Sequence, residues 1–457
     1  MPTILIIGGG ASGVLMAAHL LRHCPSASVV LAERQRRIGA GVAYATDNPL
    51  HLLNVRAGNM SAFGDDPKHF ARWLLAGWVG GIGELDCSQS FAPRLLYQQY
   101  LRHALEGAVR SAPAGTLTTV AAEIVDLAET PEAVVATTAT GQVFRSDIAV
   151  LATGNEAAAR ANCGKLLDGW SRLPTLARDA SILMVGTGLT MVDHVAALVH
   201  GDHRGPVMAV SPHGRLPEAH RRVAAHAIAE DELPGEVRLP ILLKWLRERV
   251  RQSAAQGGDW RSTLDGLRPH TQALWMKLAP ADRHRFLRHC ASLWNTHRHR
   301  MPQEIAERVR DARAKGLLTI VRGRVLAVDT SERGVRTTIA LAGRPGEHRV
   351  VAHDVLIDCR GSRPDIRQTH NTLLRNVMSS ALGRPDALGL GLDVTADMEL
   401  IAATGHASER IYALGPMTTG TFWECTAVPD IRDQACRIAR RIARHARASG
   451  AGIRKVS

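Results

Sequence analysis

The sequence predicts an α/β fold built around two nucleotide-binding units, and three observations predict it. An apolar run at 3–7 leads into a glycine turn at 8–13, a helical pattern and a second apolar run. A second strand-like run leads into another glycine turn at 186–188. Between the two turns, the apolar segment 147–155 ends in Ala-Thr-Gly-Asn. Strand, glycine turn and helix in this order are typical of Rossmann-like domains. We therefore expect two such domains, with β-meanders and a helical insert.

The first turn has the residues that a dinucleotide needs. Gly8 permits a sharp turn, Gly10 permits close approach to a pyrophosphate, and Gly13 permits close packing of helix on strand. The helix N-terminus offers free N–H groups and a positive dipole end to the phosphates. Glu33 ends the next strand at about the 20-residue spacing expected of an acid that binds ribose hydroxyls. The cofactor-binding residues predicted here also include Ala11, Ser12 and Arg34.

The second turn predicts a second, exchangeable nucleotide. Gly186 and Gly188 repeat the pattern, but Met191 occupies the third glycine position. The following strand ends in Ser211 and not in an acid, and Arg215 follows it. An acid there would bind the free 2′-hydroxyl of NADH, whereas a serine and an arginine could accept a 2′-phosphate. This favours NADPH, with NADH as the alternative.

Composition excludes several other classes of protein. The 457 residues carry a net charge of +13, spread along the chain without a basic arm, so we expect an anionic small substrate and no nucleic acid. No apolar stretch reaches the roughly 20 residues that span a bilayer. The seven cysteines have neither CxxC nor metal-ligand spacing, so no metal site is expected. They indicate a reducing, cytoplasmic location and exclude a disulfide reductase with a cysteine pair. The oligomeric state stays open.

The expected organisation is discontinuous. We predict a first dinucleotide domain over 1–160, completed by 340–457, and a second domain over 161–339. A largely helical insert is expected at about 218–313. Short strands between 116 and 150, and again between 318 and 358, are interpreted as β-meanders.

Four longer motifs carry a resemblance to a known family. They are GVAYATDNPLHLLNVRAGNMSAF at 41–63, SPHGRLPEAHR at 211–221, WNTHRHRMP at 294–302 and GPMTTGTFWECTAVPDIRDQ at 415–434. Together they resemble the bacterial FAD/NAD(P)-binding (YdhS-like) family, among the two-dinucleotide-binding-domain flavoproteins related to flavin N-hydroxylating monooxygenases. The resemblance implies FAD at the first turn and NAD(P)H at the second. It also implies that Thr153 and Gly154 return the chain to the FAD site.

The resemblance further implies where the flavin ring lies. Asn54 and Arg56 are the residues we expect to touch flavin or substrate, and so the candidate catalytic residues. A cation near the flavin would stabilise its anionic reduced form. Gly415 is expected at the FAD ribityl chain, with Asp430 as the acid there; a helix N-cap is the alternative role for Asp430.

These features predict an enzyme. The first hypothesis is an FAD-dependent, NAD(P)H-oxidising monooxygenase that hydroxylates a small substrate such as an amino acid or another carboxylate. The second is a reductase or dehydrogenase without oxygen insertion. The third is a non-catalytic FAD-binding redox sensor, which two intact nucleotide motifs oppose.

Overall fold

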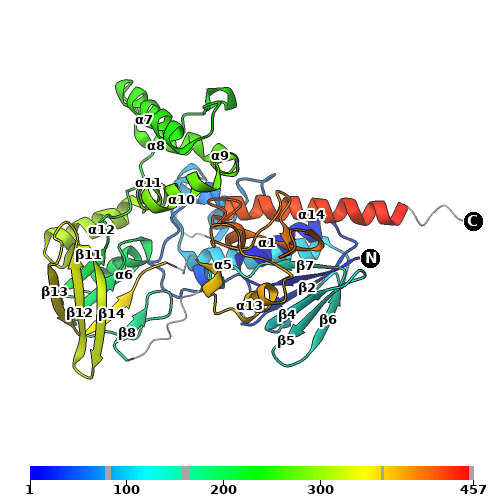
Figure 1. Ribbon diagram of the computed structural model, residues 1–457, viewed down its shortest axis with the longest axis horizontal. Coiled ribbons are helices and arrows are strands. Elements are labelled where there is room, and N and C mark those ends of the chain that lie inside the picture. Colours follow the sequence, from blue (N-terminus) through cyan, green and yellow to red (C-terminus); the bar gives the residue numbers. More distant parts are fainter. Residues whose placement is uncertain (36, 78–83, 157–163, 362–364, 452–457) are drawn as a thin grey trace, which may run out of the picture.

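The computed structural model describes residues 1–35, 37–77, 84–156, 164–361 and 365–451. Two mostly parallel sheets with flanking helices form two domains side by side, and a group of helices lies above them in Figure 1. No helix among these residues is both long and apolar enough to cross a bilayer. The expected fold of two Rossmann-like domains with an added helical segment is confirmed.

The first sheet has the strand order β15-β16-β7-β1-β2-β3, and all neighbours except β15 and β16 are parallel. Its strands are β1 (Thr3–Ile7), β2 (Ser28–Glu33), β3 (Leu117–Ala121), β7 (Ile148–Leu151), β15 (Glu399–Ile401) and β16 (Ala407–Ala413). The central strand β1 is apolar and buried from Ile4 to Ile7 because helices and loops cover both faces of a parallel sheet. Three long helices, α1 (Ala11–His23), α5 (Arg94–Ser111) and α14 (Val428–Ala451), pack together beside it.

The second sheet has the order β13-β12-β11-β10-β9-β14-β8. Its strands are β8 (Leu166–Asp168), β9 (Ile182–Val185), β10 (Val207–Ser211), β11 (Leu318–Ser331), β12 (Gly334–Leu341), β13 (His348–His353) and β14 (Val355–Asp358). Helix α6 (Leu189–His200) follows β9, and α12 (Gln303–Ala314) packs against α6 before β11 begins. The fully buried β9 lies at the centre of the parallel part of this sheet, between β10 and β14, and leads into the second glycine turn.

The expected domain boundary at 340 is wrong, because it falls inside β12. Strands β12, β13 and β14 all belong to the second sheet, which therefore extends to Asp358. Sheet pairing overrides the local resemblance of this stretch to a separate meander. The interpretation of 116–150 as one meander also needs correction. Strands β3 and β7 join the first sheet, and only β4 (Ile124–Glu129), β5 (Val134–Thr138) and β6 (Val143–Ser146) form a three-stranded meander.

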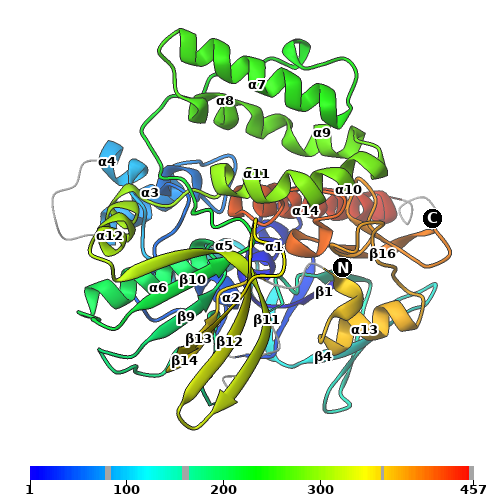
Figure 2. The ribbon, with the colours of Figure 1, turned by 60° about the vertical axis from the view of Figure 1, so that its left-hand side comes forward.

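The helical insert stands off from the two sheets, at the top of Figure 2. Its helices are α7 (Leu239–Ala255), α8 (Trp260–Leu267), α9 (Thr271–Lys277), α10 (Pro280–His289) and α11 (Ala291–Arg298). Its core contains Trp275 and Phe286, and the Trp275 ring stacks on Trp423 with ring centroids 4.8 Å apart. The insert therefore docks on the C-terminal part of the first domain.

The remaining helices are short. They are α2 (Gly41–Tyr44), α3 (His69–Gly77), α4 (Glu84–Gln89) and α13 (Thr372–Ser379), with 3-10 turns at Ala57–Asn59, Glu230–Glu232, Arg268–His270, Ile366–Gln368 and Gly415–Thr418.

Candidate functional site: two nucleotide turns and the cavity between the domains

The first glycine turn has backbone geometry that other residues would not tolerate. Gly8 has φ +107°, and a Cβ there would lie 2.5 Å from the carbonyl oxygen of Ala152. A Cβ on Gly13 would lie 1.8 Å from the carbonyl oxygen of Gly8. Helix α1 begins at Ala11, and no side chain caps its N-terminus. Its free N–H groups therefore remain available to an anion.

Glu33 closes one side of this turn. Its carboxylate accepts hydrogen bonds from the N–H of Gly9 at 2.6 Å and from the N–H of Gln35 at 2.8 Å. The neighbouring Arg34 is exposed and lies 3.8 Å from Glu123, so it makes at most a weak surface ion pair. Binding of ribose by Glu33 and a role for Arg34 in the site stay predictions.

The sequence argument missed the loop that forms the opposite side. The N–H of Gly39 donates to the Gly9 carbonyl at 2.7 Å, and Gly41, at φ +51°, faces Gly10. A Cβ on Gly10 would lie 3.3 Å from the Cα of Gly41. Gly39 and Gly41 could have indicated this loop in the sequence, because two glycines shortly after Glu33 allow the chain to return over the glycine turn.

Residues from three distant segments meet at the first turn and fit a bound dinucleotide. Thr153 follows β7, and its buried Oγ1 has no hydrogen-bond partner among the described residues, so it is free to bind a ligand. Gly154 has φ +69° and open space where a Cβ would stand. Gly415 lies beside Ser12, where a Cβ would come within 2.8 Å of the Ser12 hydroxyl. These residues therefore leave room and an unused donor where a cofactor would bind.

The second turn repeats the geometry of the first. Gly186 has φ +110°, and a Cβ there would lie 2.8 Å from the carbonyl oxygen of Cys359, just after β14. Gly188 precedes α6, whose N-terminus has no side-chain cap, and a Cβ on Gly188 would meet open space. Met191 at the third position is fully buried. The loop after β14 thus plays the part in the second domain that the loop after β7 plays in the first.

Ser211 and Arg215 lie together at the carboxyl end of β10, with cations that the sequence argument missed. The Ser211 hydroxyl lies 2.8 Å from Thr187 Oγ1, so it is already part of the turn. Arg215 is exposed. Arg322 pairs with Ser211 across β10 and β11. Burial, followed by the charges of Arg215, Arg322 and Arg324, lowers the pKa of His213. These three arginines form a cationic edge; only strand pairing brings Arg322 and Arg324 to it.

A buried ion pair connects the two domains. Arg94, the first residue of α5, lies 2.7 Å from the Asp193 carboxylate on α6, and both side chains are mostly buried. Arg94 Nε also donates to the Leu52 carbonyl at 3.1 Å. Burial raises the pKa of Asp193 to about 6, and Arg94 opposes the rise. Burial and the charges of His194 and Arg94 lower the pKa of His51 to about 4, so His51 is neutral at pH 7.

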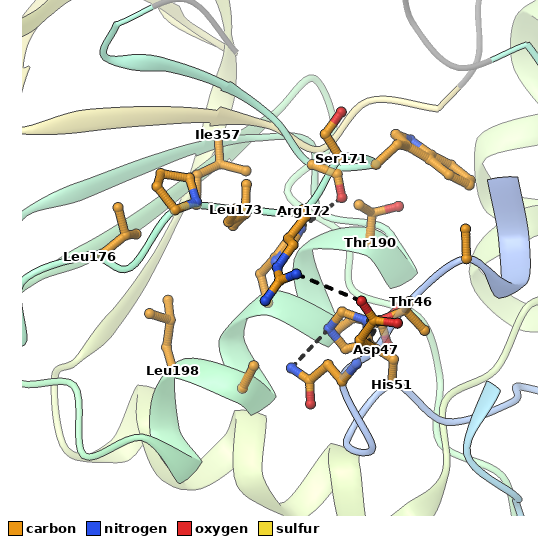
Figure 3. Close-up of a pocket in the computed structure, with 18 of the residues that line it drawn as sticks. Thr46, Asp47, His51, Ser171, Arg172, Leu173, Leu176, Thr190, Leu198 and Ile357 are labelled. Atoms are coloured by element: carbon orange, nitrogen blue, oxygen red, sulfur yellow. Dashed lines mark hydrogen bonds and ion pairs between the residues drawn. The ribbon is translucent and has the colours of Figure 1, made fainter. Parts of the chain in front are cut away.

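This ion pair lies on the wall of a cavity of about 500 Å³ between the domains. Figure 3 shows Thr46, Asp47 and His51 on the first-domain side, facing Thr190 and Leu198 of α6. The opposite end is apolar, with Leu173, Leu176, Leu198 and Ile357. At the rim, Arg172 Nη1 lies 3.9 Å from the Asp47 carboxylate across the domain boundary. The volume falls in the range of small-molecule sites.

Asn54 and Arg56 lie where the first domain meets the segment that leads into the insert. The Arg56 guanidinium donates to the carbonyls of Gln89 at 2.9 Å and Arg221 at 3.0 Å, and it covers the Phe91 ring. The Asn54 carbonyl accepts from His220 Nε2 at 2.9 Å. Both residues therefore hold this junction together; contact with flavin or substrate stays a prediction.

Asp430 lies in the first turn of α14 and pairs with Arg268 of the insert at 3.2 Å. Burial raises the pKa of Asp430, and Arg268 opposes the rise. The side chain that contacts Gly415 is Gln434 and not Asp430: the Gly415 N–H donates to Gln434 Oε1 at 2.7 Å. The sequence did not indicate this contact. Asp430 thus binds the insert, and its role at the ribityl chain stays a prediction.

The sequence of residues 5–156 matches the FAD-NAD(P)-binding family. That stretch contains the first glycine turn, Glu33 and Thr153. This stretch is similar to the FAD-NAD(P)-binding domain that the family model describes. No curated protein matches the sequence significantly.

Solved structures of flavoproteins share the whole fold at low sequence identity. Ornithine hydroxylase from Pseudomonas aeruginosa aligns with TM-score 0.66 and 16% identity, covering 98% of this chain and 100% of its own. Ornithine N-hydroxylase from Kutzneria sp. 744, solved with reduced FAD, NADP⁺ and L-ornithine, aligns with TM-score 0.66, 15% identity, and 98% and 100% coverage. The FAD-bound cadaverine monooxygenase of Erwinia amylovora aligns with TM-score 0.65, 11% identity, and 96% and 94% coverage. The chain therefore has the two-dinucleotide-domain flavoprotein fold over nearly its full length.

Proposed function

We propose that this chain is an FAD-dependent, NADPH-oxidising monooxygenase that hydroxylates the nitrogen of a small amine carrying a carboxylate. The observation that carries the proposal is the pair of uncapped helix N-termini, each behind a glycine turn, in two domains that line one cavity between them. Such an arrangement suits two dinucleotides whose reactive ends meet between the domains. When bound, FAD would take a hydride from NADPH and activate oxygen.

The residues of the first turn would hold FAD. The N-terminus of α1 would receive the pyrophosphate, Glu33 the ribose, and Thr153 would supply a hydroxyl to the cofactor. The N-terminus of α6 would receive the pyrophosphate of NADPH, and Arg215 with Arg322 would attract its 2′-phosphate. Fold similarity to ornithine and cadaverine hydroxylases supports nitrogen as the hydroxylated atom.

The cavity would bind the substrate. At its rim, Asp47 of the first domain lies 3.9 Å from Arg172 of the second and 3.1 Å from Arg37 of its own domain. A zwitterionic amine could replace the longer, exposed pair with contacts of its own, with its ammonium on Asp47 and its carboxylate on Arg172. The apolar end would take the carbon chain and exclude water.

The test measures how tightly NADPH oxidation is coupled to hydroxylation of the amine. FAD-loaded protein is given NADPH, oxygen and a panel of small amines, and hydroxylamine product, hydrogen peroxide and NADPH consumption are measured together. The proposal is supported if one class of amine gives hydroxylamine in proportion to the NADPH consumed. Peroxide equal to NADPH with every amine, or turnover with an acceptor in the absence of oxygen, favours the reductase. Failure to bind FAD excludes both enzymes.

The substrate position has its own test. Leu198→Trp narrows the apolar end of the cavity, whereas Val143→Trp places the same side chain on an exposed strand of the meander. We expect Leu198→Trp to raise KM for the amine about tenfold or more, with FAD content and NADPH-driven flavin reduction unchanged. If both variants had the same KM for the amine, the substrate would bind elsewhere.

A further inference from the structure

Three metal-ligating side chains meet away from both nucleotide turns. His19 and His23 lie one turn apart on α1, and Cys436 projects from the neighbouring α14. One ligand atom from each lies within 4.8 Å of the others. His23 Nε2 lies 3.5 Å from Cys436 Sγ. We propose that His19, His23 and Cys436 form a binding site for a zinc ion.

The hydrogen bonding of His19 supports a free ligand nitrogen. His19 is 2% exposed, and its Nε2 lies 3.0 Å from the Ala62 carbonyl oxygen. A carbonyl can only accept, so Nε2 carries the proton. Nδ1 is buried and has no hydrogen-bond partner among the described residues.

That pattern is the one metal-bound histidines use. One ring nitrogen binds the ion while the other donates its proton to a backbone carbonyl, which fixes the tautomer and the orientation of the ring. A histidine that served only for packing would leave Nδ1 buried without a partner, which destabilises the folded protein. An ion would supply the missing partner.

The distances suit zinc. Zn–S bonds of about 2.3 Å and Zn–N bonds of about 2.0 Å at tetrahedral angles place the sulfur and the nitrogen about 3.5 Å apart. The His23–Cys436 separation of 3.5 Å already has this value. Two imidazoles and one thiolate leave a fourth position for water on the partly exposed side, where His23 and Cys436 lie.

The charges around the site are of both signs. Arg440 and Arg22 lie near Cys436, and so do the carboxylates of Asp65 and Asp433. Arg22 is paired with Asp65 at 2.7 Å, so its positive charge is largely compensated. One thiolate then offsets half the charge of a divalent ion.

The site would have a structural role. It would join α1, whose N-terminus forms the first glycine turn, to α14, whose Gln434 binds Gly415 at the same cofactor site. Binding to the folded state alone would stabilise it by mass action. This role does not depend on the reaction that the protein catalyses.

The experiment uses untagged, FAD-loaded protein stripped of metal with a chelator. It is titrated with Zn²⁺ against a chromophoric competitor, and with Co²⁺ while ligand-field bands in the red, beyond flavin absorption, are recorded. We expect one ion per chain, tetrahedral Co²⁺ bands with a thiolate charge-transfer band, and a higher unfolding temperature with Zn²⁺. Cys436→Ser and His23→Gln should weaken binding about a hundredfold or more, whereas the control Cys290→Ser should bind as wild type.

A second measurement avoids reliance on variants that fail to fold. Zn²⁺ should slow alkylation of Cys436 in the wild-type protein, followed by mass spectrometry, and leave Cys290 unaffected. No stoichiometric binding by the wild type, or binding that Cys436→Ser does not change, would overturn the proposal. None of these measurements requires turnover. A negative result for zinc binding would therefore leave the proposed oxidoreductase activity standing, and absence of that activity would leave the zinc site standing.

Discussion

Arg94 and Asp193 form an ion pair of 2.7 Å that joins the two dinucleotide domains through their helices α5 and α6. Arg94 is the first residue of α5, and Asp193 lies near the N-terminus of α6. The ion pair therefore fixes the N-terminal ends of these two helices relative to one another. It also lies on the wall of the interdomain cavity, next to His51 and His194. The protonation of Asp193 is therefore coupled to the contact between the domains.

The first prediction concerns this coupling. The folded pKa of Asp193, about 6, lies above its unfolded value of about 3.9. The folded protein therefore binds the proton more tightly, and Asp193 contributes stability below pH 4 that is lost as pH rises to 6. The free energy of unfolding of wild type minus that of Asp193→Asn should fall over this range, measured by urea denaturation.

Neighbouring groups do not account for that difference. Burial lowers the pKa of both His51 and His194, which gives the opposite slope of stability against pH and is common to both proteins. A difference curve that is flat between pH 4 and pH 6 would show that Asp193 titrates normally.

A methyl group at Gly13 should prevent FAD binding. The Gly13→Ala Cβ would meet the Gly8 carbonyl, which is backbone and cannot rotate away. We expect a loss of about 3 kcal/mol in stability and little bound flavin in the purified protein. Gly77→Ala, at the exposed end of α3 with open space around it, is the matched control. It should keep both the stability and the flavin content of the wild type. Flavin content would be read from the visible spectrum after denaturation.

Glu33→Gln should weaken FAD while leaving the fold intact. The amide can still accept from Gly9, but it loses the charge-assisted hydrogen bonds expected to the ribose hydroxyls. The dissociation constant for FAD, measured by flavin fluorescence quenching, should rise about tenfold. Glu123→Gln removes an exposed carboxylate near Arg34 and should change the FAD dissociation constant little. Unchanged affinity in Glu33→Gln would contradict the ribose assignment.

The cationic edge should set the choice of nicotinamide cofactor. Replacing Arg215 and Arg322 with alanine should raise KM for NADPH about tenfold and leave that for NADH nearly unchanged, because only NADPH carries the 2′-phosphate. Steady-state NAD(P)H oxidation measures both. Arg344→Ala, an exposed arginine in the β12–β13 turn, controls for loss of general positive charge. Parallel losses for both cofactors would indicate an electrostatic effect without specificity.

Much of the first nucleotide site could be predicted from the sequence. The run 3–7 forms β1 with the expected bounds, and Gly8, Gly10 and Gly13 form the turn in front of α1. Local sterics explain this, since a positive φ and a Cβ-free contact are required over a few consecutive residues. The largely helical insert expected at about 218–313 likewise contains the five helices α7 to α11.

The tertiary structure alone decided which distant residues meet. Membership of β12 to β14 in the second sheet depends on pairing with strands far away in the chain, so the boundary at 340 could not be found locally. Arg322 reaches Ser211 by strand register, Arg94 reaches Asp193 by domain packing, and Cys436 reaches His23 by the contact of α1 with α14. The glycine turns were determined by the sequence because short-range sterics act within them, whereas these contacts depend on long-range packing.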